Sequence, residues 1–230
     1  MFNIAKEWNP KQALLKDIIL KEDRFEQAVE LCLEMHSLVH TSEMSGVDME
    51  TFEDQIWKGL GEEGFRAVLP GNQVSIAWNL WHLTRIEDIT ANILIADDIQ
   101  VFNSGKWKDK VKSIVEDTGN AMSDHEIIDF SSRICMQELR NYRIETGRKT
   151  RQVIKALTPG QMKNKVKPDR VRRVLDEGGV LEHEESIWLL DFWGRKTTAG
   201  ILLMPITRHQ IVHLNDSLSI KEKFNKSYRH

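Results

Sequence analysis

Apolar residues recur along most of this chain at intervals of three and four positions, with little alternation of period two. That spacing is typical of helices that bury one face, whereas half-buried strands alternate. Proline and glycine, which interrupt helices, are sparse at 5 and 13 of 230 residues. The pattern predicts five helices, at about 11–41, 51–60, 74–96, 124–157 and 195–218.

Residues at the expected helix ends support these boundaries. Thr51, with an acidic residue three positions later, is a rough N-cap pattern, and either Ser123 or Asp124 caps the fourth helix. A further short basic helix, PDRVRRVLDEGG, opens at Pro168 and closes at glycines. The rest of 160–193 is the least regular part of the chain.

Proline also marks the last expected helix. Pro205 lies inside it, so we expect a kink there, because proline removes a backbone hydrogen bond. Long helices joined by polar connections are typical of helix bundles. We therefore expect an all-α fold, an antiparallel four-helix bundle, in which residues 1–230 form a single domain.

Composition narrows the class of protein. Hydrophobic residues make up 40% and charged residues 29%, which is ordinary for a globular protein, and the net charge of −3 offers no basic footprint for nucleic acid or membrane. No apolar run reaches the roughly 18 residues of a membrane span, and charges come too early for a secretory signal. Cys32 and Cys135 are too few for a disulfide framework and are expected as buried thiols in a reducing cytoplasm.

Candidate chemistry first appears in WNLWHLTRIEDIT, residues 78–90, where His82 lies among apolar residues. A helix returns close to the same direction after 4, 7 and 11 residues. The residues at those spacings are Trp78, Ile86, Ile89 and Ile93. His82 is therefore on the buried stripe, where a histidine taken alone is usually structural.

The last helix changes that interpretation. TRHQIVHLND places His209 and His213 four positions apart, so both imidazoles leave one face of a helix, as in HExxH zinc sites. No acidic residue lies between them, so this is not that protease motif. Leu202 and Ile206 continue the same face, which indicates that both histidines point inward.

The other histidines leave alternatives open. His36 and His40 have the same four-residue spacing. They could supply another metal ligand, a hydrogen-bond donor behind a ligand, or a general base, and His40 could line the same cavity. Alternatively, they mark a frayed, half-exposed helix end. His125 and His183 are expected at the surface, and His230 is a terminal residue.

Together, WNLWHLTRIEDIT and the distant MPITRHQIVHLND resemble the DinB-like family of bacterial metal-binding four-helix bundles. In that family one histidine of the second bundle helix joins an HxxxH pair of the last. The resemblance implies His82, His209 and His213 as metal ligands, nickel or zinc as the ion with manganese and iron as alternatives, and a homodimer. It covers 25–102 and 196–218, and it implies that 147–193 is an insertion.

The resemblance also bears on activity, since some members transfer groups to or from low-molecular-weight thiols and many have no assigned activity. Three imidazoles leave a coordination position open, so that a bound ion can polarise a carbonyl, lower the pKa of bound water to about 7, or bind a thiolate. The first hypothesis is a cytoplasmic metal-dependent enzyme acting on a small molecule, either a transferase that uses a small thiol or a hydrolase.

Several residues near the histidines are candidates for supporting roles. Asp216 lies three positions after His213 and is expected to border the cavity mouth. Glu87 and Asp88 lie off the His82 stripe and are expected to be solvated or to form an inter-helix salt bridge. Arg85 is expected either to hold an anionic substrate or to pair with a carboxylate.

The catalytic candidates are therefore His40, Arg85 and Asp216, while Trp78 and Trp81 are expected in the core or in a pocket wall. A second hypothesis is a non-catalytic metal- or ligand-binding bundle that acts in stress response or protein interaction. The observation that would favour it is a filled coordination sphere, with a fourth ligand from His36 or His40 and no cavity that opens to solvent.

DNA binding is a third hypothesis, which would need the basic stretches 148–155 and 168–174 to form one surface. The overall charge balance argues against it.

Overall fold

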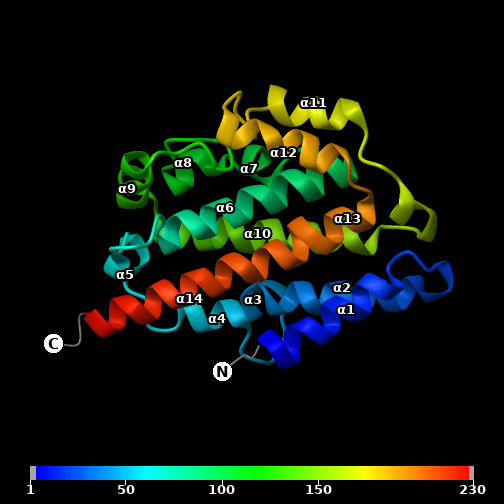
Figure 1. Cartoon of the computed structure of the whole chain (residues 1–230), viewed down its shortest axis with the longest axis horizontal. Coiled ribbons are helices and arrows are strands. Elements are labelled where there is room, and N and C mark those ends of the chain that lie inside the picture. Colours follow the sequence, from blue (N-terminus) through cyan, green and yellow to red (C-terminus); the bar gives the residue numbers. More distant parts are fainter. Residues whose placement is uncertain (1–3, 228–230) are drawn as a thin grey trace.

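Helices make up the structure throughout residues 4–227, which are the residues that the computed structural model describes (Figure 1). The expected all-α class is confirmed, and within these residues the β-type pairing is confined to one isolated bridge between Lys165 and Thr197. In chain order, with η for a π-helical or 3-10 segment, the elements are η1 (Ile4–Trp8), α1 (Asn9–Ile18), η2 (Glu22–Arg24), α2 (Phe25–Leu38), α3 (Ser42–Ser45), α4 (Phe52–Trp57), α5 (Glu62–Arg66), α6 (Ile76–Asp88), η3 (Ile89–Ala96), α7 (Val101–Ser104), α8 (Trp107–Val111), α9 (Asp124–Arg133), α10 (Met136–Lys155), η4 (Pro159–Lys163), α11 (Pro168–Asp176), α12 (Glu184–Gly194), α13 (Thr198–Leu203), η5 (Met204–Arg208) and α14 (His209–Ser227).

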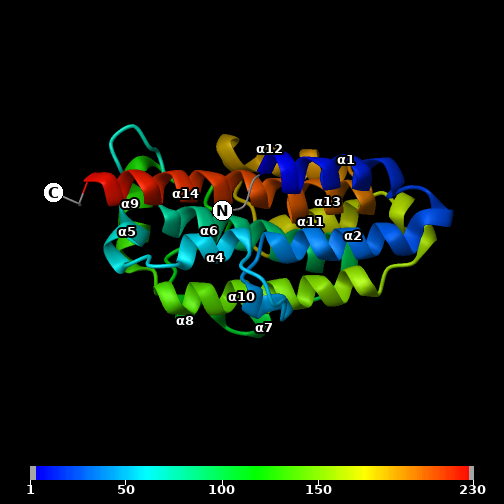
Figure 2. The ribbon, with the colours of Figure 1, turned by 90° about the horizontal axis from the view of Figure 1, so that it is seen from below.

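Four long helical segments lie side by side: α2, α6 with η3, α10, and α13 with η5 and α14 (Figures 1 and 2). The chain runs in one direction through α2 and α14 and in the opposite direction through α6 and α10. Helix α6 lies between α10 and α14 and packs against both of them. All 13 residues of α6 are buried, so its polar side chains must find their partners inside the protein.

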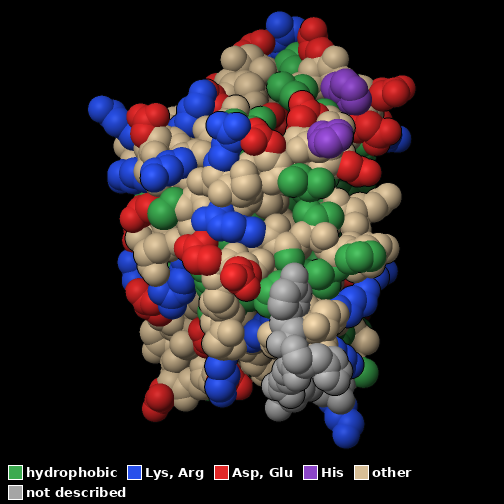
Figure 3. Space-filling model, turned by 90° about the vertical axis from the view of Figure 1, so that its left-hand side faces the viewer, with side chains coloured by type: hydrophobic (Ala, Val, Ile, Leu, Met, Phe, Trp, Pro, Cys, Tyr) green, Lys and Arg blue, Asp and Glu red, His purple; other side chains and the backbone are tan. Residues whose placement is uncertain are grey.

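The surface carries charges of both signs. Figure 3 shows acidic and basic side chains interspersed at the end of the molecule where α5, α9 and the end of α14 lie. In the basic stretches 148–155 and 168–174, acidic side chains of the protein pair with Arg148, Lys149, Arg170, Arg172 and Arg173. Such paired side chains form an ordinary solvated surface, which gives no support to the DNA-binding hypothesis. Within residues 4–227, the structure contains no helix whose length and apolarity would suit a membrane crossing.

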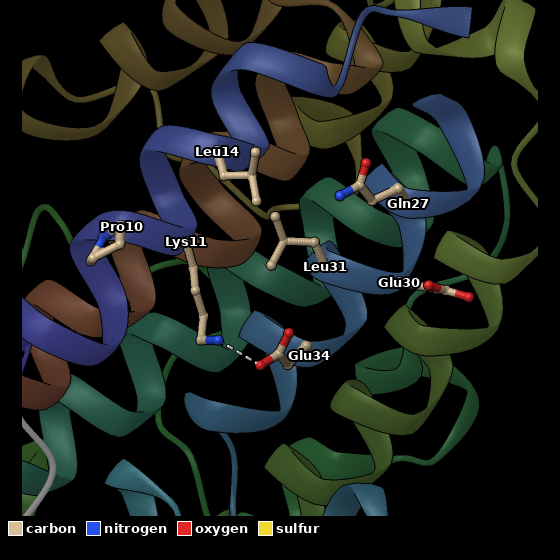
Figure 4. Close-up of a pocket in the computed structure, with 7 residues that line it drawn as sticks. All are labelled: Pro10, Lys11, Leu14, Gln27, Glu30, Leu31 and Glu34. Atoms are coloured by element: carbon tan, nitrogen blue, oxygen red, sulfur yellow. Dashed lines mark ion pairs between the residues drawn. The ribbon is translucent and has the colours of Figure 1, made fainter. Parts of the chain in front are cut away.

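The prediction of one helix over 11–41 is wrong, because α1 and α2 are two helices joined by a reversal. The charged run KEDR begins at Lys21, whose backbone is extended, and it separates them. Figure 4 shows α1 lying against α2, with Leu14 facing Leu31 and an ion pair of 2.7 Å between Lys11 and Glu34. The reversal brings the apolar face of α1 back onto the core.

The prediction of one helix over 124–157 is also wrong. The chain is extended at Ile134 and Cys135, between α9 and α10, and the Cys135 N–H donates to the Val111 carbonyl at 2.8 Å. This contact with α8 replaces a hydrogen bond within a helix, and the pattern of apolar residues does not reveal it. The start of α9 was predicted correctly, with Ser123 as the N-cap in a capping box with Glu126.

Other predicted boundaries are confirmed. Thr51 caps α4 in a capping box with Asp54, and Pro168 opens α11, which ends before Gly178 with its left-handed φ of 70°. Pro205 lies in η5, where the regular helix is interrupted between α13 and α14. The prolines and caps therefore act locally, as their chemistry requires.

The segment 147–193, expected as an insertion, begins inside α10 and continues through η4, α11 and α12. Helices α11 and α12 lie along one side of α6 and η3 (Figure 1). Helix α12 was not predicted, since its sequence EESIWLLDFWG has apolar residues on most sides and no clear period. Its residues Leu189 and Trp193 are buried in the same core as α6.

Candidate metal centre

The structure brings His82, His209 and His213 together. The first comes from α6 and the other two from the beginning of α14, one turn apart. The Nε2 atoms of His82 and His209 are 3.2 Å apart, and the three pairs of ring centroids are separated by 4.6 to 5.0 Å. One ring nitrogen of each lies within 4.8 Å of those of the other two, so all three can reach one ion.

Neighbouring groups fix the orientation of two of these rings. The Nδ1 of His82 lies 2.8 Å from the Thr118 carbonyl oxygen, which can only accept, so Nδ1 carries the hydrogen and Nε2 keeps a lone pair directed at the other histidines. The Nδ1 of His213 lies 3.1 Å from Oδ1 of Asn79 and donates to it in the same way. Outer partners of this kind are typical of metal-ligating histidines.

The loop that carries Thr118 is itself held by two tryptophans of α6. The indole N–H of Trp78 donates to the Gly119 carbonyl at 3.2 Å, and that of Trp81 donates to the Asp117 carbonyl at 3.1 Å. The Trp78 ring also stacks on His82, with centroids 4.7 Å apart and planes 7° from parallel. The tryptophans around His82 therefore position both the imidazole and the carbonyl that orients it.

The nitrogen lone pairs fit a cation. The lone pair of His82 Nε2 faces the Nε2 of His209, while the buried Nδ1 of His209 has no hydrogen-bond partner among the described residues. Tetrahedral zinc with Zn–N distances of about 2.0–2.1 Å holds its ligand nitrogens roughly 3.3 Å apart. The observed separation of 3.2 Å is close to that value. The residues present therefore suit a divalent ion.

Burial keeps these imidazoles neutral, which is the form that binds a metal. Burial, together with the nearby His213, lowers the pKa of His82 to about 3. Burial also lowers the pKa of His209 well below its ordinary value, and it lowers that of His213. At neutral pH all three rings offer lone pairs rather than positive charges.

A cavity of about 410 Å³ adjoins the three histidines. Trp78 and Trp81 were each expected in the core or in a pocket wall. Trp78 lines this cavity, whereas Trp81 is fully buried in the core. His209 and His213 are only partly buried, so the cluster faces this cavity rather than a closed core. A ligand could therefore approach the point on which the three rings converge.

His36 and His40 form a separate cluster. Both are buried, so the expectation of a frayed, half-exposed helix end is wrong. Their Nε2 atoms lie 2.8 and 2.9 Å from the two carboxylate oxygens of Glu87, and neither side chain lines the cavity beside His82. Glu87 is fully buried between α2 and α6, so it forms the inter-helix pair and is not solvated.

The cluster of His36, His40 and Glu87 also has the ligand types and spacing for an ion. The Nδ1 atoms of both histidines are buried without hydrogen-bond partners among the described residues. An ion on the two Nε2 atoms would leave both Nδ1–H groups as buried donors without acceptors, which is costly. In the cluster of His82, His209 and His213, by contrast, two of the three rings have an outer acceptor and His209 alone lacks one. When instead the two Nε2–H groups of His36 and His40 donate to Glu87, each Nδ1 is left as a lone pair, at a smaller cost. The geometry favours a closed hydrogen-bonded cluster.

The guanidinium group of Arg85 is also hydrogen-bonded to other groups of the protein. Its guanidinium donates to the Glu116 carbonyl at 2.8 Å, to the Tyr142 hydroxyl at 3.0 Å and to Gln100 at 2.9 Å, and it lies 3.5 Å from the carboxylate of Asp88. It is 1% exposed and does not line the cavity, so the structure favours pairing over contact with an anionic substrate.

Asp88 was expected to be solvated or in an inter-helix pair, and the solvated alternative is wrong. It is buried and accepts from the Tyr142 hydroxyl at 2.6 Å and from the backbone N–H groups of Val101 and Phe102 at 2.8 Å. Asp216 is exposed and shares a separate hollow, of about 590 Å³, with Trp78 and His213. It does not line the cavity beside His82.

The remaining single-residue predictions divide simply. Cys32 is buried as predicted, whereas Cys135 is only partly buried. His125 and His183 are exposed as predicted, and His230 lies outside the described residues.

Thr118 and Asn79 were not predicted from the sequence, because only carboxylates were considered as hydrogen-bond partners of the metal-binding histidines. Asn79 had a usable signal: it lies three positions before His82 on the same helix. Thr118 acts through its backbone carbonyl, for which a sequence carries no signal.

No protein-family model matches this chain, and a search of curated proteins finds no significant match.

The cluster around Glu87 gives a stability prediction. In Glu87→Gln the amide offers one acceptor where the two imidazole N–H groups need two, so the free energy of unfolding should fall by about 2 to 4 kcal/mol in urea at pH 7. Glu30→Gln, at an exposed position on α2, should change it by less than about 0.5 kcal/mol.

The same variant should show a defined pH dependence. Burial opposes ionisation of Glu87, yet the imidazoles of His40 and His36 hold its pKa well below the ordinary value. A carboxyl with a lowered pKa stabilises the fold above its unfolded pKa of about 4.3 and loses that contribution as the pH falls through the folded pKa. The difference between wild type and Glu87→Gln should be largest above about pH 5 and shrink on acidification. A constant difference would contradict an ionised Glu87.

Proposed function

We propose that this chain is a divalent-metal-binding protein of the DinB-like type, in which His82, His209 and His213 hold the ion. We further propose that it is a metal-dependent enzyme acting on a small molecule, either a transferase that uses a low-molecular-weight thiol or a hydrolase. Nickel or zinc is the proposed ion, with manganese and iron as alternatives that imidazole ligands also accept.

The observation that carries the proposal is that three imidazoles converge and no fourth ligand joins them. Among the described residues, no cysteine, aspartate, glutamate or further histidine belongs to this group. Structural zinc sites are usually closed by four protein ligands, whereas catalytic sites keep a position for water or substrate. A fourth ligand from His36 or His40 would favour the non-catalytic hypothesis, and both of these histidines are bonded to Glu87 instead.

The arrangement of the long helices supports the family assignment. We propose that α2, α6, α10 and α14 form a four-helix bundle in which two helices run each way, and that the ligands come from its second and last helices. That distribution of ligands is the one implied by the resemblance of WNLWHLTRIEDIT and MPITRHQIVHLND to the DinB-like family.

In the proposed reaction the protein's own groups mainly orient and shield. Thr118 and Asn79 hold two of the rings with their lone pairs inward, and Trp78 covers one face of His82. Apolar side chains line most of the adjoining cavity. A bound divalent ion supplies Lewis acidity at its open position, or a binding point for a thiolate.

Metal content tests the proposal. Wild-type protein should bind about one equivalent of nickel or zinc, measured by elemental analysis after removal of excess ion. His82→Ala and His209→Ala should each bind close to none while their helical circular dichroism is retained, and His125→Ala, at an exposed position, should behave as wild type. At an ion concentration 100-fold above Kd, binding adds about 2.7 kcal/mol of stability, a rise in Tm of several degrees. A metal-free protein whose Tm does not respond to either ion would overturn the proposal.

The outer partners give a sharper test. Asn79→Ala removes the acceptor for His213 Nδ1 and should weaken metal affinity about 10- to 100-fold, measured by competition with a chelating dye. Thr118→Ala keeps the carbonyl that accepts from His82 and should leave affinity within about threefold. Equal effects of the two substitutions would show that the outer hydrogen bonds do not position the ligands.

A further inference from the structure

Two chemically different sets of side chains line the cavity beside the three histidines. The histidines come from α6 and α14, and most of the apolar lining comes from a wall formed by α12 and η5. The apolar side chains that this wall contributes are those of Trp188, Leu189, Phe192, Trp193, Met204 and Pro205. A ligand that fills the cavity would therefore contact coordinating nitrogens with one part of its structure and an aromatic-rich wall with another.

Charge is missing from this lining. Among the described residues that line the cavity, none is an aspartate, glutamate, lysine or arginine, and the polar side chain besides the histidines is that of Asn120. An anionic group placed against such a wall would lose its hydration without gaining a partner. A cationic group would meet a like charge at Phe192, because the Lys196 ammonium already lies 3.8 Å from the centroid of that ring. The part of the ligand that does not reach the histidines is therefore uncharged.

The volume of the cavity limits the size of the ligand. The cavity volume of about 410 Å³ lies in the range of about 300–1,000 Å³ that holds small molecules. Flat aromatic side chains on one wall favour a ring, because stacked and edge-to-face contacts add to the burial of apolar area.

From these features we propose that the site selects neutral molecules with an aromatic or other bulky apolar body and one metal-binding donor group, and that Trp188 and Phe192 of α12 determine this specificity. This inference rests on the proposed metal centre. The rings of Trp188 and Phe192 meet edge to face, with centroids 5.9 Å apart. Trp188 is 49% exposed although it lines the cavity, so it lies where a ligand would enter and would be covered when one binds.

Helix α12 belongs to the segment 147–193, which the resemblance to the DinB-like family implies is an insertion. Within this segment α11 packs on η3 and on α12, and Leu189 and Trp193 of α12 belong to the core, so the position of α12 relative to His82 is fixed. The proposal thus gives this segment a role. It supplies the apolar wall that contacts the body of the bound small molecule, while α6 and α14 supply the histidines that hold the ion.

The test uses cobalt-substituted protein and two thiols that share a donor and differ in their bodies, benzyl mercaptan and 2-mercaptoethanol. Binding of each thiolate is followed by the change in the visible cobalt spectrum. We expect benzyl mercaptan to bind wild type at least tenfold more tightly, equivalent to about 1.4 kcal/mol. Trp188→Ala with Phe192→Ala should reduce that preference to less than about threefold, while the affinity for 2-mercaptoethanol and the cobalt content stay unchanged.

Leu181→Ala is the matched control, because Leu181 is an exposed apolar residue of the same segment that does not line the cavity, and it should keep the full preference. If cobalt binds and both thiols bind wild type equally, or the preference survives in the double variant, the inference on substrate class is overturned and the metal centre stands. If no cobalt binds at stoichiometric level, the proposed function fails, and this inference fails with it.

Discussion

The complete burial of α6 is the constraint on which the rest of the structure depends. A buried polar side chain is tolerated only where it has a hydrogen-bond partner, so the polar residues of this helix dictate what must lie around it. Several of them bond to other parts of the chain. The pairs are His82 with Thr118, Asn79 with His213, Glu87 with His36 and His40, and Asp88 with Tyr142.

These pairs have different consequences along the helix. The carboxylates of Glu87 and Asp88 accept hydrogen bonds from protein groups. These bonds connect α6 to the histidines at the end of α2 and to α10. His82 is different, since only its Nδ1 is satisfied by the protein and its Nε2 faces two more imidazoles and a cavity. The polar network thus leaves one place on α6 where lone pairs converge, and the proposed chemistry is located there.

The sequence predicted the parts of this arrangement that depend on helical periodicity. The stripe through Trp78 and Ile86 placed His82 inward, and the four-residue spacing placed His209 and His213 on one face; the structure brings all three together. Both interruptions of the predicted long helices were missed. At Cys135 the cause is a backbone hydrogen bond to α8, and such a contact between distant segments leaves no periodic signal. The hydrogen bonds of Glu87 to His36 and His40 were not predicted for the same reason. Periodicity shows which face of a helix is buried, but not which other helix covers that face.

Whether His82, His209 and His213 hold one ion can be read from a crystal structure of the protein loaded with zinc, with diffraction data collected on both sides of the zinc absorption edge. We expect one strong anomalous peak about 2.0–2.1 Å from the ring nitrogens of His82, His209 and His213, with a remaining position open toward the cavity. A peak between His36, His40 and Glu87 instead, or no peak at either cluster, would contradict it.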